Sequence, residues 1–497
     1  MAPEYEIVIG LEVHSQLLTK SKMFCSCSAE YQNAEPNTIV CPVCMGMPGA
    51  LPVINRRAVE FVIRTGLALG CTIAGYTKFD RKNYPYPDLM KGYQISQFDQ
   101  PIAIGGSLAT EANGHGSTVR ITRVHLEEDT AKLIHRTAQH GESYTLMDIN
   151  RSGVPLMEIV SEPDIRSSEQ ATDYLTSLRS IVRYIGVSTG NMEEGSFRCD
   201  ANISIRPRGD SELGAKVEVK NMNSFRSVQR ALDFEAERQL RAMREGERIV
   251  QETRGWDDAR GTTVSQRSKE YASDYRYFPE PDLPPLIIER ESVTALEETQ
   301  PELPKAKQGR FVEQYGLPEY EASHLTSSRA TADFFEAAME GSTLDGVALA
   351  TRAKSVGNWM LGELTRLVSL EGIEIGDTKI QPGQLNGLLD LVDAGTLNST
   401  MAKAVFEEMF KSGRPPEEIA EETGMVQITD ADAVQKAVAE AVESNPDPVA
   451  DYLNGKETAM RFLVGQVMKI TRGKANPQMA AELLKQELDS LRKTDER

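Results

Sequence analysis

The hydrophobic period changes once along the 497-residue sequence, near residue 293, and this change restricts the folds the chain can adopt. Before it, alternating strand patterns mix with helical repeats, whereas beyond it almost every periodic segment has the three-and-four spacing of a helix. Four prolines interrupt regular pairing shortly before the change, at positions 279, 281, 284 and 285. We therefore predict an α+β domain over residues 1–293, followed by all-α structure.

Local patterns within the α+β domain predict strands over residues 6–14, 201–206 and 215–219, and helices over 167–186 and 224–246. Ser167 can cap the first of these helices and Gly186 can end it. In the first strand, Glu12 and His14 are two residues apart, so their side chains are expected on one face.

The helical part is predicted to contain two domains. Residues 411–416 read Lys-Ser-Gly-Arg-Pro-Pro, a loop sequence that would follow a helix ending near Phe410. We therefore place an all-α helical domain at residues 294–405 and a small all-α tail domain at residues 406–497. The length of the chain also favours several separate cores.

Composition limits the class of protein. Hydrophobic residues make up 40% and charged residues 26% of the chain, which is typical of globular proteins. The N-terminus lacks the pattern of a signal peptide, and no apolar run approaches the ~20 residues of a membrane span. We therefore expect a cytoplasmic protein without membrane contact.

The net charge of −19 argues against general affinity for nucleic acids, so any RNA contact must come from a local basic patch. One candidate patch is an amphipathic helix near the C-terminus. Its basic residues alternate with Phe462, Leu463, Val467 and Ile470, and they are Lys456, Arg461, Lys469, Arg472 and Lys474. Such a face can dock on an RNA backbone, although it can equally be a solvated surface.

Two close pairs of cysteines form the strongest chemical pattern. The first pair is Cys25 and Cys27, and the second is Cys41 and Cys44. The loop between the two pairs is long enough to let them come together. Four thiolates in this arrangement predict a structural Zn²⁺ site, because no position is left for water. The alternative is a set of buried thiols.

A second pattern combines Glu12 and His14 with Glu158 and the acidic run Glu127, Glu128 and Asp129. Hard cations such as Mg²⁺ prefer oxygen ligands, and one imidazole can complete the set. Glu158 lies within an apolar run, so a buried carboxylate there needs a partner. Acidic runs are more often solvated faces, and that alternative stays open.

A third pattern interleaves cations and aromatic residues between positions 80 and 94, namely Arg81, Lys82, Tyr84 and Lys91. Such residues can contact phosphate and stack on a base or ribose. A proline-rich surface loop explains them equally well. The G-x-x-x-x-G-K-[ST] pattern of a P-loop is absent from the sequence. Cys71 and Cys199 stand apart, and neither lies in a recognisable nucleophile turn, which disfavours a cysteine glutaminase.

Several long and distinctive motifs occur along the chain. They are IGLEVH at 9–14, KFDRKNY at 78–84, YQISQFD at 93–99, IVSEPD at 159–164, GSFRCD at 195–200 and FLVGQVM at 462–468. These motifs resemble the B subunit of the glutamyl/aspartyl-tRNA(Gln/Asn) amidotransferase, and the resemblance extends from about residue 5 to residue 488.

The resemblance implies a heterotrimer with the A and C subunits that acts on misacylated Glu-tRNA(Gln) or Asp-tRNA(Asn). In this family, the B subunit phosphorylates the side-chain carboxylate with ATP and Mg²⁺, and ammonia that the A subunit releases from glutamine then forms the amide. The first domain would be a cradle related to glutamine synthetase, and the tail would contact tRNA.

The same resemblance implies roles for single residues. Glu12, His14, Glu128 and Glu158 look like Mg²⁺ ligands, with Glu127 as an alternative to Glu128. The four clustered cysteines look like the zinc ligands that part of the family has. A competing interpretation is a tRNA-binding adaptor without catalytic activity. The sequence leaves open which of the two misacylated tRNAs is used.

Overall fold

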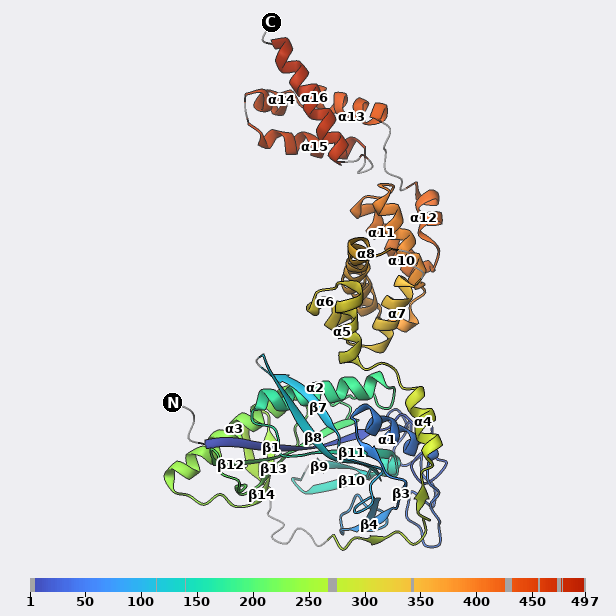
Figure 1. The fold of residues 1–497 in the computed structure, drawn as a ribbon, viewed down its shortest axis with the longest axis vertical. Coiled ribbons are helices and arrows are strands. Elements are labelled where there is room, and N and C mark those ends of the chain that lie inside the picture. The colour runs from blue at the N-terminus through green and yellow to red at the C-terminus, as the bar shows by residue number, and fades with distance from the viewer. Residues whose placement is uncertain are drawn as a thin grey trace. The chain divides into compact units, whose positions relative to one another are not determined.

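The structure is a computed structural model, and it describes residues 5–112, 114–138, 140–266, 275–340, 344–424, 431–454, 456–471, 475 and 477–495. The chain forms two compact units, Met1–Pro304 and Lys305–Arg497 (Figure 1). The first unit is rich in sheet and the second is helical, which confirms the predicted α+β class. Helix α4 (Arg290–Glu298) packs against α1 (Arg56–Ala68), so the first unit continues beyond residue 293.

A ten-stranded sheet forms the centre of the first unit, in the order β15-β14-β13-β12-β1-β11-β8-β6-β2, with β7 also paired to β8. The N-terminal strand β1 lies inside this sheet, between β11 and β12. The strands are β1 (Tyr5–Gln16), β2 (Thr72–Ile73), β6 (Ala103–Ile104), β7 (Ser107–Ala112), β8 (His115–Glu128), β11 (Pro155–Ser161), β12 (Phe197–Pro207), β13 (Val217–Lys220), β14 (Glu252–Asp257) and β15 (Thr262–Ser265).

Helices α2 (Ser168–Tyr184) and α3 (Phe225–Glu245) pack against each other and contribute to the core of the first unit. Along β1, Leu11 and Val13 are buried in this core. Because side chains alternate along a strand, Glu12 and His14 project to the opposite, polar face. One face of the sheet therefore packs into the core, and the other carries polar side chains that can form a site.

Three small sheets complete the first unit. They are β3 (Tyr76–Thr77) with β17 (Leu286–Ile287), β4 (Asp80–Asn83) with β5 (Tyr93–Ser96) and β16 (Phe278–Pro279), and β9 (Lys132–Thr137) with β10 (Ser143–Asp148). The short 3-10 helix η1 (Ile149–Arg151) follows β10. The pairing of β4 with β16 brings the segment after residue 275 beside the cation-rich segment that begins at residue 80.

In the described part of the second unit, every element longer than one residue is a helix. Its first group comprises α5 (Pro304–Tyr315), α6 (Glu319–Leu325), α7 (Arg329–Met339), α8 (Gly346–Trp359), η2 (Met360–Leu364), α9 (Thr365–Glu371), η3 (Ile375–Asp377), α10 (Pro382–Asp393), α11 (Ser399–Ser412) and α12 (Pro416–Thr423). The second group comprises α13 (Ala431–Glu443), α14 (Pro446–Leu453), α15 (Thr458–Ile470) and α16 (Pro477–Asp495), and it has its own hydrophobic core.

The position 405/406, where the sequence suggested a boundary, falls inside α11. This helix buries Val405, Phe406 and Met409, and it packs against α10 and α12. The separate core of the last four helices begins only at Val434. None of the helices in the described part of the chain is long and apolar enough to cross a membrane.

Candidate functional site

Three neighbouring strands bring a histidine and two carboxylates together on the polar face of the sheet. In the register of β1 and β11, His14 lies directly opposite Glu158. Glu158 in turn lies opposite His125 of β8, and Glu127 is two residues further along β8 on the same face. The antiparallel pairing of β1, β11 and β8 thus positions His14, Glu127 and Glu158 as one group.

The ligand atoms of His14, Glu127 and Glu158 all lie within 4.8 Å of one another. Nε2 of His14 is 3.7 Å from Oε1 of Glu127 and 3.5 Å from Oε2 of Glu158. Both carboxylates are buried, which is costly for negative charge without a cationic partner. One imidazole and two carboxylates suit a divalent cation, so this donor set fits a metal site.

The electrostatics of the group support this interpretation. Burial alone would lower the pKa of His14, but the hydrogen bond and charge of Glu158, together with the charge of Glu127, raise it to about 8. Burial alone would raise the pKa of Glu158, but His125 and His14 hold it well below its ordinary value. The carboxylate is therefore ionised, and a metal ion that binds His14 would have to displace a proton.

His125 is a component of this site that the sequence alone did not suggest. Its Nε2 lies 3.2 Å from Oε2 of Glu158, while its Nδ1 accepts a hydrogen bond from Nε of Arg123 at 3.4 Å. Nε2 therefore carries the proton and donates to the carboxylate, which fixes the orientation of Glu158. The sequence did contain one signal for His125. It stands two residues before Glu127 in one strand, and alternate residues of a strand share a face.

The acidic run of residues 127–129 is divided among three different environments. Glu127 faces His14, whereas Glu128 pairs with Nζ of Lys91 at 2.5 Å and accepts a hydrogen bond from the backbone N–H of Ile95. Asp129 pairs with Arg198 at 3.0 Å. Successive strand residues point to opposite faces, so Glu127 joins His14 and Glu158 and Glu128 does not.

Glu12 is on the same face as His14 but outside the three-residue group. Its carboxylate accepts a hydrogen bond from Nδ2 of Asn202 at 2.9 Å. Directly across from Glu12 on β12 lies Asp200, which pairs with Lys220 at 2.6 Å. The structure therefore places Glu12 beside Asn202 and Asp200, outside the group of His14, Glu127 and Glu158.

The cation-rich segment contains one lysine whose surroundings differ from those of its neighbours. Arg81 makes a bidentate pair with Glu280, and Lys91 pairs with Glu128, so carboxylates offset both charges. Lys82 instead lies over the rings of Tyr84 and Tyr275. The hydroxyl of Tyr84 donates to Gln94 at 3.4 Å.

The four clustered cysteines are close together and are not joined by disulfides. Their sulfur atoms lie within 4.8 Å of one another, and Sγ of Cys41 and Sγ of Cys44 are 3.9 Å apart. A tetrahedral ion with Zn–S bonds of ~2.3 Å separates its sulfurs by ~3.8 Å, so the group fits zinc. A hydrogen bond from Cys25 lowers the pKa of Cys44 to about 4, which favours a thiolate there.

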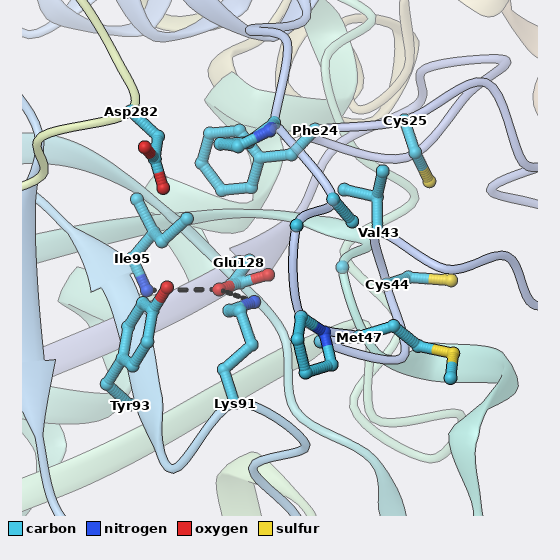
Figure 2. A pocket seen from close by; sticks show the side chains of 16 residues that line it. Phe24, Cys25, Val43, Cys44, Met47, Lys91, Tyr93, Ile95, Glu128 and Asp282 are labelled. Carbon is cyan, nitrogen blue, oxygen red and sulfur yellow. Dashed lines mark hydrogen bonds and ion pairs between the residues drawn. The ribbon is translucent and has the colours of Figure 1, made fainter.

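A cavity of about 190 Å³ lies between the cysteine loop and the Glu128–Lys91 pair (Figure 2). Phe24, Cys25 and Cys44 line one side, and Tyr93 and Lys91 line the other. Glu128 points into this cavity and is bonded there to Lys91 and Ile95. The loop that carries the cysteines is thus also a wall of a polar cavity.

Cys71 and Cys199 are both buried, and burial raises the pKa of Cys71 to about 12 and that of Cys199 well above its ordinary value. Neither thiol is ionised at neutral pH, so neither is suited to nucleophilic catalysis. We expect the variants Cys71→Ala and Cys199→Ala to keep the full activity of the protein per folded molecule. Loss of activity in a variant with an unchanged melting temperature would contradict this expectation.

In the second unit, α15 is amphipathic, with Leu463 and Val467 buried and Arg461 and Lys469 exposed. Phe462 is 48% exposed, so it lies on the outer side of the helix together with the cations. Lys456 pairs with Asp451 at 2.8 Å, which offsets part of the basic charge. The predicted patch residues Arg472 and Lys474 lie outside the described residues.

Residues 7–294 match the GatB/GatE catalytic domain, and residues 333–488 match the GatB domain. A protein of Dehalococcoides mccartyi, named as the B subunit of aspartyl/glutamyl-tRNA(Asn/Gln) amidotransferase, is 54% identical over 488 residues, covering 98% of this chain and 99% of the relative. Proteins of the same name from Carboxydothermus hydrogenoformans and Thermomicrobium roseum are 52% and 54% identical, covering 98% of this chain and 100% and 99% of their own lengths. The chain therefore belongs to the family of aspartyl/glutamyl-tRNA(Asn/Gln) amidotransferase B subunits.

Proposed function

We infer that this chain is the B subunit of a cytoplasmic tRNA-dependent amidotransferase, a carbon–nitrogen ligase with glutamine as amido donor. It would act with the A and C subunits as a heterotrimer on Glu-tRNA(Gln), Asp-tRNA(Asn) or both. The observation that carries the proposal is the group of His14, Glu127 and Glu158, which lies within the matched catalytic domain and has the ligand chemistry of a divalent-cation site.

The proposed reaction has two steps on this chain. A side-chain carboxylate of the tRNA-borne amino acid first attacks the γ-phosphorus of ATP, and ADP leaves. Ammonia that the A subunit supplies then attacks the acyl phosphate, and phosphate leaves. The first step is needed because a carboxylate oxygen is a poor leaving group, whereas phosphate is a good one.

In this proposal, His14, Glu127 and Glu158 hold Mg²⁺, and His125 orients Glu158. The ion would supply positive charge that offsets the charge of the phosphates. Glu127 replaces Glu128 as the ligand, because Glu128 is turned toward Lys91. Arg81, Lys82, Tyr84 and Lys91 would border the nucleotide, and Glu12 would lie beside the metal site.

Zinc is proposed for the cysteine group of Cys25, Cys27, Cys41 and Cys44, where it would stabilise the loop. Four sulfur ligands leave no open position, so the ion would take no part in the reaction. A relationship of the first unit to glutamine synthetase would agree with a sheet that carries metal and nucleotide on one face.

The decisive test is a single-turnover assay with γ-labelled ATP. The complex purified with its partner subunits is mixed with Glu-tRNA(Gln), Asp-tRNA(Asn) or the correctly charged tRNAs in the absence of glutamine. We expect label to transfer to at least one misacylated tRNA. Binding of tRNA without any transfer of label would identify the chain as an adaptor that does not catalyse the reaction.

A truncation tests the proposed role of the last four helices in tRNA binding. Ending the chain after Gly424 leaves α11 and α12 intact, whereas ending it at residue 405 would divide a packed helix. We expect the chain that ends at Gly424 to keep its remaining structure but to bind tRNA at least about tenfold more weakly, with a smaller salt dependence. Unchanged affinity over a salt titration would show that the basic face of α15 is only solvated.

A further inference from the structure

Lys82 is the one lysine of the region between residues 78 and 91 whose charge is not offset by a carboxylate within 4.0 Å, as far as the described residues go. Lys78 pairs with Asp80 and Asp99, both at 2.6 Å, and Lys91 pairs with Glu128. No hydrogen-bond acceptor for the ammonium of Lys82 is found among the same residues. Its three N–H donors are therefore available to a ligand.

Aromatic rings hold this ammonium in place. Nζ of Lys82 lies 5.1 Å from the ring centre of Tyr275 and 6.0 Å from that of Tyr84, which are cation–π distances. Tyr275 packs edge-on against Tyr84 and Tyr277, and Tyr277 stacks on Phe98 at 4.2 Å. Rings attract a cation without accepting its hydrogen bonds, so they fix the lysine and leave its donors free.

Two carboxylates of the metal-type group, which comprises His14, Glu127 and Glu158, supply negative charge that acts on Lys82. Burial alone would lower the pKa of this lysine, but the charge of Glu127 and then that of Tyr277 and Glu158 raise it above its ordinary value. The ammonium therefore stays protonated under the charge of the two carboxylates. Lys82 is partly exposed, so a ligand can reach it.

We propose that Lys82 is a catalytic residue that contacts the transferred phosphoryl group of a nucleoside triphosphate, with Tyr84 and Tyr275 as its positioning residues. This inference rests on the proposed function. In the step concerned, a carboxylate oxygen forms a bond to the γ-phosphorus, the bond from that phosphorus to the β–γ bridging oxygen breaks, and the electron pair leaves with ADP. Lys82 keeps its proton throughout and offsets charge on the phosphoryl oxygens.

The test compares Lys82→Met with the wild-type chain, each in the complete complex, under saturating Glu-tRNA(Gln) or Asp-tRNA(Asn). The readout is single-turnover transfer of label from γ-labelled ATP. Removal of one preorganised donor is expected to slow this transfer about 100-fold. Lys82→Arg, which keeps the charge, should recover part of the loss. Lys354→Met is the matched control, because Lys354 is an exposed lysine of α8 in the other unit.

Three further readouts separate catalysis from structure. The melting temperature and the affinity for tRNA should be the same in Lys82→Met and in wild type, and the affinity for Mn²⁺ should not fall, because loss of a positive charge that acts on Glu127 and Glu158 does not weaken cation binding. A wild-type transfer rate in Lys82→Met, or a loss that only follows a lowered folded fraction, would overturn the inference. If Lys82→Met does not fold, the same measurements are made on Lys82→Gln. The polar amide of glutamine suits a partly exposed position, and it also removes the positive charge.

The wild-type complex is measured first, so that the two proposals fail in different ways. Transfer by wild type together with an unaffected Lys82→Met would leave the proposed function standing and remove only the role of Lys82. Absence of transfer by wild type would remove the proposed function, and the inference about Lys82 with it.

Discussion

Replacing Glu158 by glutamine is expected to reduce phosphoryl transfer to misacylated tRNA by at least about 100-fold. The amide keeps the shape of the side chain but removes a negative charge that lies 3.5 Å from His14 and 3.2 Å from His125. Metal should bind more weakly, because a neutral amide is a poorer ligand for a hard cation than a carboxylate. The rate is measured in a single turnover, and Mn²⁺ affinity is measured on the same preparation.

Two controls locate the defect of the Glu158→Gln variant. Glutaminase activity of the complex should remain at its basal level, and ammonium chloride in place of glutamine should not restore amidation. Glu245→Gln is the matched substitution, because Glu245 is exposed at the end of α3. If ammonium chloride did restore full amidation, Glu158 would serve ammonia delivery rather than carboxylate activation.

Replacing Cys41 by serine is expected to release about one zinc ion per chain and to lower the stability of the first unit. A structural zinc ion can contribute ~10–16 kcal/mol to the folding of a small motif, and loss of even ~2 kcal/mol lowers the melting temperature of a domain by about 4–8 °C. Metal analysis of the purified protein and a thermal melt provide the measurements. Activity should follow the folded fraction.

Cys71→Ala is the matched control for the zinc experiment, because Cys71 is buried and does not belong to the four-cysteine group, so its replacement should leave the metal content unchanged. A wild-type preparation without zinc that nevertheless melts at the temperature of the zinc-loaded protein would refute the zinc assignment. The cavity beside the cysteine loop adds a second readout, since loss of the loop would also disturb the wall next to Lys91.

Local signals were sufficient to predict α2 and α3 of the first unit, whereas α1 and α4 were not predicted. Ser167 accepts a hydrogen bond from the backbone N–H of Gln170, and Ser224 caps α3 in the same way. Gly186 and Gly246 follow the helices with φ of 70° and 75°, a conformation that glycine adopts without strain. These helices are therefore confirmed to within about two residues, because caps and periodicity depend only on neighbours in sequence.

The composition of the metal-type group was harder to predict, because it depends on pairing between distant strands. Whether Glu127 or Glu128 faces His14 is decided by the register of β8 against β11, and a shift of one residue would exchange them. The position of His125 opposite Glu158 follows from the same register. The cysteine loop differs, since all four of its thiols come from one short segment.

The central position of β1 in the sheet has a consequence for synthesis of the protein on the ribosome. β1 is made before both of its partners, and β11 begins about 140 residues later. At ~5–20 residues per second, β1 must wait about 7–30 s before either neighbour exists. The apolar segment of β1 formed by Ile7, Val8 and Ile9 remains without strand partners during this interval. Nascent chains arrested before residue 155 should therefore bind holding chaperones, and chains arrested well past residue 207 should be released from them.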